Sequence, residues 1–172
     1  MLISPGYQTL LQETHRTRHW GVGGHKCIQH FMPLFVELGC TTLLDYGSGK
    51  ETLRIALAAQ FPNIWVYCYD PGVFGREYCK SADFVVCNDV LEHVEPELID
   101  NVLAHICTLA TKGAYLTAGL RPAKHVLPDG RNAHLIIEKS EWWYAKVKAQ
   151  SWVIKQWTGG EQYKRACFWV VK

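Results

Sequence analysis

The sequence predicts an α/β fold: a doubly wound, mostly parallel sheet with helices on both faces. From residue 41 onward, short apolar runs alternate with stretches in which apolar side chains recur every three or four residues, which indicates strands alternating with helices. The last two apolar runs are joined by a turn at Gly159 and Gly160 rather than by a helix. We therefore expect these two final strands to be antiparallel to each other.

Each short apolar run is predicted as a strand. The first run ends at Asp45 and the second at Asp70, so polar groups follow both strands directly. In parallel sheets ligands bind beyond the carboxyl ends of the strands, where the strand order reverses, so these positions are expected to line a site. The predicted strands are residues 41–45, 64–69, 83–87, 114–118, 152–157 and 166–171.

Helical spacing of apolar residues predicts the helices. Pro96 is a favourable first-turn residue for the helix after the third strand, and Ser140 is expected to cap the last helix, which carries Trp142 and Trp143. Two further helices are predicted before the first strand, on either side of a glycine-rich breaker at residues 21–24. The predicted helices are residues 8–20, 26–38, 51–60 and 96–109, together with the one capped by Ser140.

Composition indicates one packed domain. The chain has 172 residues, of which 48% are hydrophobic and 20% charged, which excludes a disordered or low-complexity protein. No apolar run reaches the length of a membrane span, and the start lacks the pattern of a secretion signal. The seven cysteines form no C-x-x-C pair and are expected to be reduced thiols. We expect a single cytoplasmic domain, with residues 1–39 as a helical cover over a core of residues 40–172, and no membrane partner.

The net charge of +2 conceals an asymmetry along the chain. Residues 1–110 carry 7 Lys and Arg against 12 Asp and Glu, whereas residues 111–172 carry 11 against 4. A basic final third favours an anionic small-molecule partner if it lines the site, although an ordinary solvated surface explains the charges as well. No basic helix marks a duplex nucleic-acid partner. The expected substrate-binding residues lie in one polar loop: Arg121, Lys124, Arg131 and Asn132.

A glycine pair lies between the first strand and its helix, in the segment DYGSG at residues 45–49. Glycines there let a ligand approach the backbone closely, and a carboxylate at Asp70 can accept hydrogen bonds from both hydroxyls of a ribose. Glu51 stands where a dinucleotide fingerprint needs a third glycine, and its charge would repel a pyrophosphate. These features predict a phosphate-free adenosyl ligand, S-adenosylmethionine.

Three segments resemble motifs of class I S-adenosylmethionine-dependent methyltransferases: LLDYGSGKE, DFVVCNDVLEHV and NAHLIIEKSEWWYAKV, with Asp70 similar to the ribose-binding acid of that family. The resemblance covers residues 40–172 and implies a Rossmann-like sheet of the seven-stranded type with an antiparallel last strand. Only 12 residues separate Asp70 from Asp83, too few for the usual third strand and its helix. We therefore expect that unit to be missing.

The resemblance also implies a set of cofactor contacts. It places Asn88 beside the methionine end of the cofactor, and Trp20 is expected to close over the cofactor as part of an N-terminal lid. Because the third strand is missing, Phe74, Tyr78 or Ser81 would have to shape the adenine pocket. The expected cofactor-binding residues are Asp45, Tyr46, Gly47, Ser48, Gly49, Asp70, Pro71, Asn88 and Trp20.

Three side chains are candidates for catalysis. His93 is the candidate general base, because imidazole titrates near neutral pH; its alternative is a helix-start histidine bonded to a loop carbonyl. Asp89 is the candidate substrate carboxylate, or else a structural cap, and His134 is the candidate acceptor contact. His15 and His19 have a spacing that can hold a metal, but without a third ligand no metal is expected.

The leading interpretation is a methyltransferase that uses S-adenosylmethionine to methylate a small metabolite, nucleotide or sugar, with an anionic group favoured by the basic final third. A non-catalytic module that binds an adenosyl ligand, or a partner subunit, is the alternative. A nicotinamide-dependent oxidoreductase is disfavoured by Glu51 and by the lack of a second domain for its substrate.

Overall fold

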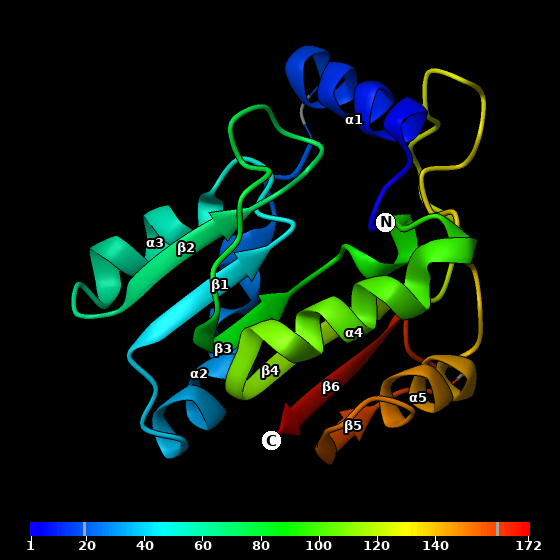
Figure 1. Cartoon of the computed structure of the whole chain (residues 1–172). Coiled ribbons are helices and arrows are strands. Elements are labelled where there is room, and N and C mark those ends of the chain that lie inside the picture. Colours follow the sequence, from blue (N-terminus) through cyan, green and yellow to red (C-terminus); the bar gives the residue numbers. More distant parts are fainter. Residues whose placement is uncertain (19, 161) are drawn as a thin grey trace.

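The computed structural model describes residues 1–18, 20–160 and 162–172, and its centre is a six-stranded sheet (Figure 1). Strands β1 to β4 run parallel to one another, and β6 is antiparallel to both β4 and β5. The strand order is β2 (Trp65–Tyr69), β1 (Thr42–Tyr46), β3 (Ala82–Cys87), β4 (Ala110–Gly119), β6 (Arg165–Val171) and β5 (Val153–Thr158). The predicted α/β fold is confirmed, including the antiparallel final pair.

The strand order reverses at β1. The chain passes from β1 to β2 on one side and then returns to β3 on the other side, so β1 and β3 flank a topological switch point. Residues 70–81 connect β2 to β3 directly, without an intervening strand or helix. The third strand of the seven-stranded type is therefore missing, as the short spacing predicts.

Helices α2 (Ile28–Glu37) and α3 (Thr52–Gln60) cover one face of the sheet. Phe31 of α2 and Leu57 of α3 are fully buried against Phe84 of β3 and its neighbours. Residues 28–37 therefore pack in the core layer, whereas the sequence suggests that all of residues 1–39 form a cover. Their apolar stripe is buried against the sheet face, as amphipathic helices require.

Helices α4 (Ile99–Leu109) and α5 (Ser140–Lys148) cover the opposite face, where Leu103 and Trp143 are fully buried. A 3₁₀ turn, η3 (Pro96–Leu98), precedes α4, so Pro96 begins the turn rather than the α-helix. Ser140 is not the cap of α5 but its first residue, and its Oγ accepts a hydrogen bond from the Gly160 N–H at 2.8 Å. Among the helices of the described residues, none combines the length and the apolar character needed to cross a bilayer.

Helix α1 (Pro5–Thr17) lies across the carboxyl edge of the sheet rather than on either face (Figure 1). It begins earlier than predicted because Ser4 caps it, accepting the Tyr7 N–H, and Pro5 suits the first turn. The Tyr7 hydroxyl donates to the His93 carbonyl at 2.8 Å, which ties α1 to the segment after β3. The predicted helix to residue 20, and the metal spacing with His19, include residue 19, which lies outside the described residues.

Candidate active site

Two adjoining cavities open at the carboxyl ends of β1 and β3. The smaller, about 110 Å³, lies under α1 and has mainly apolar walls. The larger is a cleft of about 610 Å³, within the size range of small-molecule sites. Residues that line both cavities are Trp20, Gly21, Gly47, Asp89 and His93. The site therefore lies at the switch point, as the strand order predicts.

The glycine turn after β1 is shaped by close contacts that only glycine permits. Gly47 has a φ of +83°, and a Cβ there would lie 2.2 Å from Cγ2 of Val90. Gly49 has a φ of +49°, and its Cβ would lie 2.6 Å from the Gly21 carbonyl oxygen. Both positions favour glycine because they lie in the left-handed region. The turn thus lies directly between the segment after β3 and the N-terminal segment.

Glu51 shares that backbone conformation without being glycine. Its φ is 58°, at the start of α3, where the resembled family often has its third glycine. A left-handed conformation costs a side-chain-bearing residue roughly 1–2 kcal/mol. The Glu51 carboxylate pairs with Arg54 and with Arg76, whose Nε lies 3.0 Å away. These two ion pairs place positive charge next to the carboxylate beside the turn.

Asp70 connects the turn to the loop after β2. Its Oδ2 accepts the Gly49 N–H at 2.8 Å, and its Oδ1 accepts the Gly72 N–H at 2.9 Å. The carboxylate is 7% exposed and lies on the wall of the smaller cavity. Each oxygen keeps a second lone pair, so the group can still accept hydrogen bonds from two ligand hydroxyls.

Asp45 is a buried carboxylate at the end of β1, on the wall of the larger cleft. Burial, with the nearby charges of Asp70 and Glu51, raises its pKa to about 7. Within the described ranges its carboxylate has no hydrogen-bond donor. A cationic group bound in the cleft would offset the cost of burying this charge.

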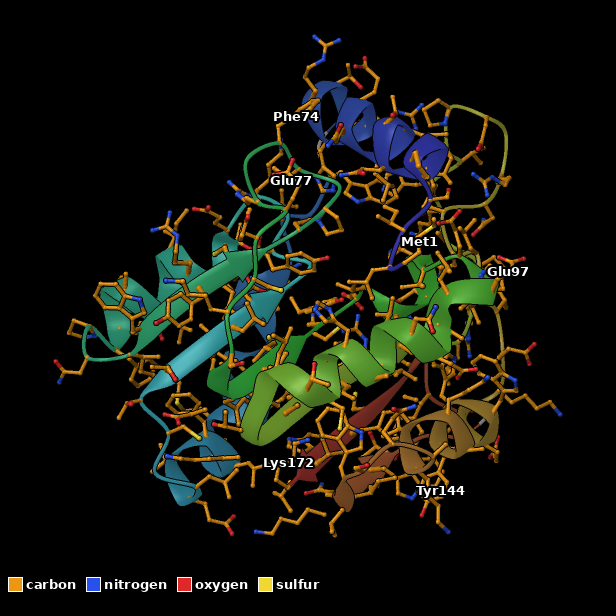
Figure 2. All side chains as sticks on the ribbon, in the orientation of Figure 1. Met1, Phe74, Glu77, Glu97, Tyr144 and Lys172 are labelled. Atoms are coloured by element: carbon orange, nitrogen blue, oxygen red, sulfur yellow. The ribbon has the colours of Figure 1, made fainter. Side chains whose placement is uncertain are left out.

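The smaller cavity is walled by residues other than those that the short loop suggests. Phe74 and Tyr78 are 73% and 93% exposed, and Ser81 is also exposed, so none of the three lines the cavity. In Figure 2 Phe74 and Glu77 lie on the outer part of this loop. The lining comes instead from the N-terminal segment and the strand ends: Leu2, Ile3, Leu11, Tyr46, Tyr69, Pro71, Val90 and Val94.

His93 and His134 face each other with ring centroids 4.9 Å apart. His93 Nδ1 lies 2.7 Å from the Ala133 carbonyl oxygen, and His134 Nδ1 lies 2.5 Å from the Arg121 carbonyl oxygen. A carbonyl can only accept, so each ring carries a proton on Nδ1. Burial lowers the pKa of His93 to about 4, so its ring is neutral at physiological pH.

Asp89 and Asn88 lie beside these rings in the larger cleft. Asp89 has a left-handed φ of 56°, its N–H donates to the Thr117 hydroxyl at 2.9 Å, and its carboxylate lies 3.2 Å from Nη2 of Arg165. Asn88 Oδ1 accepts from the same Thr117 hydroxyl at 3.4 Å. The side chains after β3 are therefore fixed by β4 and β6.

Positive charge gathers at the mouth of the larger cleft. Arg121 and Lys124 line it, as does Arg165 at the start of β6. Sequence reasoning missed Arg165. Because β6 is antiparallel to its neighbours, it begins at the edge of the sheet where they end. Arg165, its first residue, lies opposite Gly119, the last residue of β4, in the strand register.

Arg131 and Asn132 line neither cavity. Arg131 pairs with Asp129 at 2.7 Å and stacks on the Tyr7 ring. Asn132 Oδ1 accepts the N–H groups of Ala123 and His134, both at 2.9 Å, and thereby closes the turn. These contacts shape the loop, and the two residues lie outside both cavities.

The N-terminal segment closes over the site at Trp20. The indole lies 5.4 Å from the His93 ring and 5.7 Å from the His125 ring, measured between centroids. The Lys50 N–H donates to the Gly21 carbonyl at 2.8 Å. Trp20 thus separates the two cavities while lining both.

Comparison with known proteins agrees with this geometry. Residues 8–167 match the family described as a methyltransferase domain. The chain belongs to this family and is a class I S-adenosylmethionine-dependent methyltransferase. No curated protein matches the sequence.

Solved structures share the fold at low identity. An S-adenosylmethionine-dependent methyltransferase from Clostridium acetobutylicum is 11% identical with a TM-score of 0.63, over 96% of this chain and 98% of that one. Magnesium protoporphyrin IX methyltransferase from Synechocystis is 18% identical with a TM-score of 0.62, over 88% and 84%. Human N-acetylserotonin methyltransferase is 13% identical with a TM-score of 0.59, and this chain covers 56% of its length.

Proposed function

We propose that the chain binds S-adenosylmethionine across the two cavities and methylates an oxygen atom of a small anionic acceptor. The observation that carries this proposal is the pair of buried carboxylates on adjacent strands: Asp45 lies near the end of β1, just before the glycine turn, and Asp70 directly follows β2. Asp70 would accept the ribose hydroxyls, and Asp45 would compensate the positive methionine end. Bound there, the cofactor supplies an electrophilic methyl group.

The apolar smaller cavity suits the adenine ring. Its walls include Leu11, Val90 and Pro71, and Asp70 lies at its edge. The larger cleft, which Ser48 and Asn88 also line, would hold the methionine end and the acceptor. This division would leave the methyl group between Asp89, His93 and His134, the three predicted catalytic residues.

The acceptor is expected to be small and anionic because the cleft mouth carries Arg121, Lys124 and Arg165. Guanidinium groups bind carboxylate and phosphate in a bidentate manner. An oxygen acceptor is supported by the O-methyltransferases among the structural neighbours, one of which is named Mitomycin 7-O-methyltransferase. Metabolites, nucleotides and sugars that carry a hydroxyl and an acid all fit this description.

A methyl-transfer assay tests the proposal. The chain is incubated with methyl-labelled S-adenosylmethionine and a panel of sugar phosphates, nucleotides and hydroxy acids, each beside its uncharged analogue. We expect label in an anionic acceptor and little in its analogue. Cofactor binding without transfer to any acceptor would favour the alternative, a binding module without turnover. Transfer to uncharged acceptors alone would contradict the anionic class.

A further inference from the structure

Three side chains of metal-ligand type converge at the bottom of the larger cleft. Glu92, His93 and His134 each offer a ligand atom, and these atoms lie within 4.8 Å of one another. Glu92 and His93 belong to the 3₁₀ turn η2 (Leu91–His93) after β3, and His134 belongs to the loop between β4 and α5. From the sequence, only the spacing of His15 and His19 suggests a metal, and none is expected there because no third ligand is found beside them.

Both imidazoles are held in place by a hydrogen bond at Nδ1. Each directs Nδ1 at a backbone carbonyl, His93 at Ala133 and His134 at Arg121, so Nε2 is the nitrogen that each ring has left to bind a metal. Neither Nε2 has a hydrogen-bond partner within the residues that the structure describes. Metal-binding histidines typically donate their other nitrogen to a carbonyl or carboxylate in this way.

Glu92 supplies the negative charge. Its side chain is 1% exposed, and Oε1 accepts the Gly119 N–H at 2.8 Å. Its other oxygen, Oε2, is buried and has no partner in the described part of the chain. A buried carboxylate with an unpartnered oxygen is costly unless a cation or a donor meets it.

Gly119 allows the cluster to form. A Cβ at this position would lie 2.7 Å from Glu92 Oε1 and 2.8 Å from His134 Cε1. The end of β4 is thus a backbone surface against which the carboxylate and the imidazole both pack. The three ligands come from two segments that this contact holds together.

We propose that Glu92, His93 and His134 bind one divalent cation of the first transition series, such as Mn²⁺, Co²⁺ or Zn²⁺. Two imidazoles and one carboxylate suit these ions better than Mg²⁺ or Ca²⁺, which prefer oxygen ligands. Three protein ligands leave coordination positions open toward the cleft. The proposal deepens the proposed function, on which it rests, by specifying how the acceptor is activated.

The cation would act as a Lewis acid on the acceptor. A hydroxyl oxygen bound to the cation loses its proton to solvent water more readily. The oxygen then forms a bond to the methyl carbon, the bond from carbon to sulfur breaks, and its electron pair stays on sulfur to give S-adenosylhomocysteine. His93 and His134 act here as ligands of the cation and not as proton acceptors.

Direct metal binding tests the site without any acceptor. The full chain is treated with a chelator, dialysed, and titrated with CoCl₂, MnCl₂, ZnCl₂ and MgCl₂ by calorimetry, and the visible absorption of Co²⁺ is recorded. We expect one equivalent of transition-metal ion to bind, with Mg²⁺ weaker. Glu92→Gln and His134→Ala should each weaken this binding by about 100-fold or more, whereas His125→Ala, a histidine of the same cleft outside the cluster, should not.

Controls separate this proposal from the proposed function. Binding of S-adenosylhomocysteine, measured on each variant, reports an intact fold and cofactor site. Retained binding of that compound with metal affinity lost only in Glu92→Gln and His134→Ala supports the metal site. Absence of Co²⁺, Mn²⁺ and Zn²⁺ binding to the wild-type chain, or equal loss in His125→Ala, overturns the metal site and leaves methyl transfer to be judged by its own assay.

Discussion

Gly21 and Gly49 are in backbone contact: a Cβ added to Gly21 would lie 2.8 Å from Cα of Gly49. The segment that carries Trp20 is thereby pressed onto the glycine turn after β1. A side chain on either residue would therefore displace the other segment. Both residues also have a positive φ, a conformation that strains any residue other than glycine. The N-terminal segment is therefore packed directly on the turn at which we propose that the cofactor binds.

Gly21→Ala is expected to weaken the binding of S-adenosylmethionine and to lower stability by about 1–3 kcal/mol, through strain and displaced contact. Gly23→Ala is the matched control, because a Cβ there meets nothing within 4 Å and its φ is not positive. Calorimetric titration and thermal unfolding measure both effects. Equal behaviour of the two variants would show that the contact has no role in binding.

Trp20→Ala is expected to reduce cofactor affinity by about tenfold, because the half-buried indole lines both cavities and covering it with a ligand would contribute roughly 1–3 kcal/mol. Trp65, which is 67% exposed, provides the control Trp65→Ala. Quantitative titration of S-adenosylhomocysteine distinguishes them. Unchanged affinity in Trp20→Ala would remove the lid from this account.

Asp45→Asn is expected to stabilise the cofactor-free chain at pH 8 and to weaken cofactor binding. The pKa of Asp45 is raised to about 7 in the folded chain, against about 4 when unfolded, so between these values the folded state binds more protons. The contribution of this group to stability therefore falls as pH rises from 4 to 7, by up to about 4 kcal/mol.

The measurement is denaturant unfolding of wild type and Asp45→Asn at pH 4, 6 and 8. The variant should gain on the wild type as pH rises, whereas Asp100→Asn, at an exposed carboxylate, should show no such trend. In the wild type, cofactor affinity should increase as pH passes through 7. A difference in stability that is constant with pH would contradict the buried-charge argument.

Arg121→Ala is expected to raise KM for an anionic acceptor by about tenfold or more, with kcat less affected, because charged hydrogen bonds contribute roughly 1.5–3 kcal/mol. Arg131→Ala removes the same charge from the same loop, but outside the cavities, and should leave KM nearly unchanged. Steady-state kinetics at two salt concentrations compare them. A larger effect of Arg131→Ala would reverse the assignment of the two arginines.

Much of the fold can be predicted from the sequence because the strands are continuous apolar runs. Leu43 and Leu44 face opposite layers of the core and are both fully buried. A strand that is buried on both faces is read as a continuous apolar run, not as alternating apolar and polar residues. The turn at Gly47 and the acid at Asp70 each come directly after a strand. Because the two strands are parallel neighbours, these residues are expected to lie close together. The short loop after Asp70 correctly indicates that a strand is missing.

Other parts of the site depend on contacts that local patterns do not specify. The position of α1 is set by single hydrogen bonds such as the one from Tyr7 to His93, so its place above the strand ends has no periodic signal. In the sequence, Glu92 resembles an ordinary acidic residue at the start of a helix. Only the folded chain brings Gly119 and His134 next to it. The polar side chain of Asn132 closes a turn. Its residue type alone does not distinguish that role from binding a ligand.

The most direct test is a crystal structure of the chain soaked with S-adenosylhomocysteine. We expect the ribose hydroxyls at the Asp70 carboxylate, the adenine ring in the smaller cavity under α1, and the sulfur atom directed into the cleft toward Asp89, His93 and His134. Density for the compound in any other part of the molecule, with Asp45 and Asp70 untouched by it, would contradict the account.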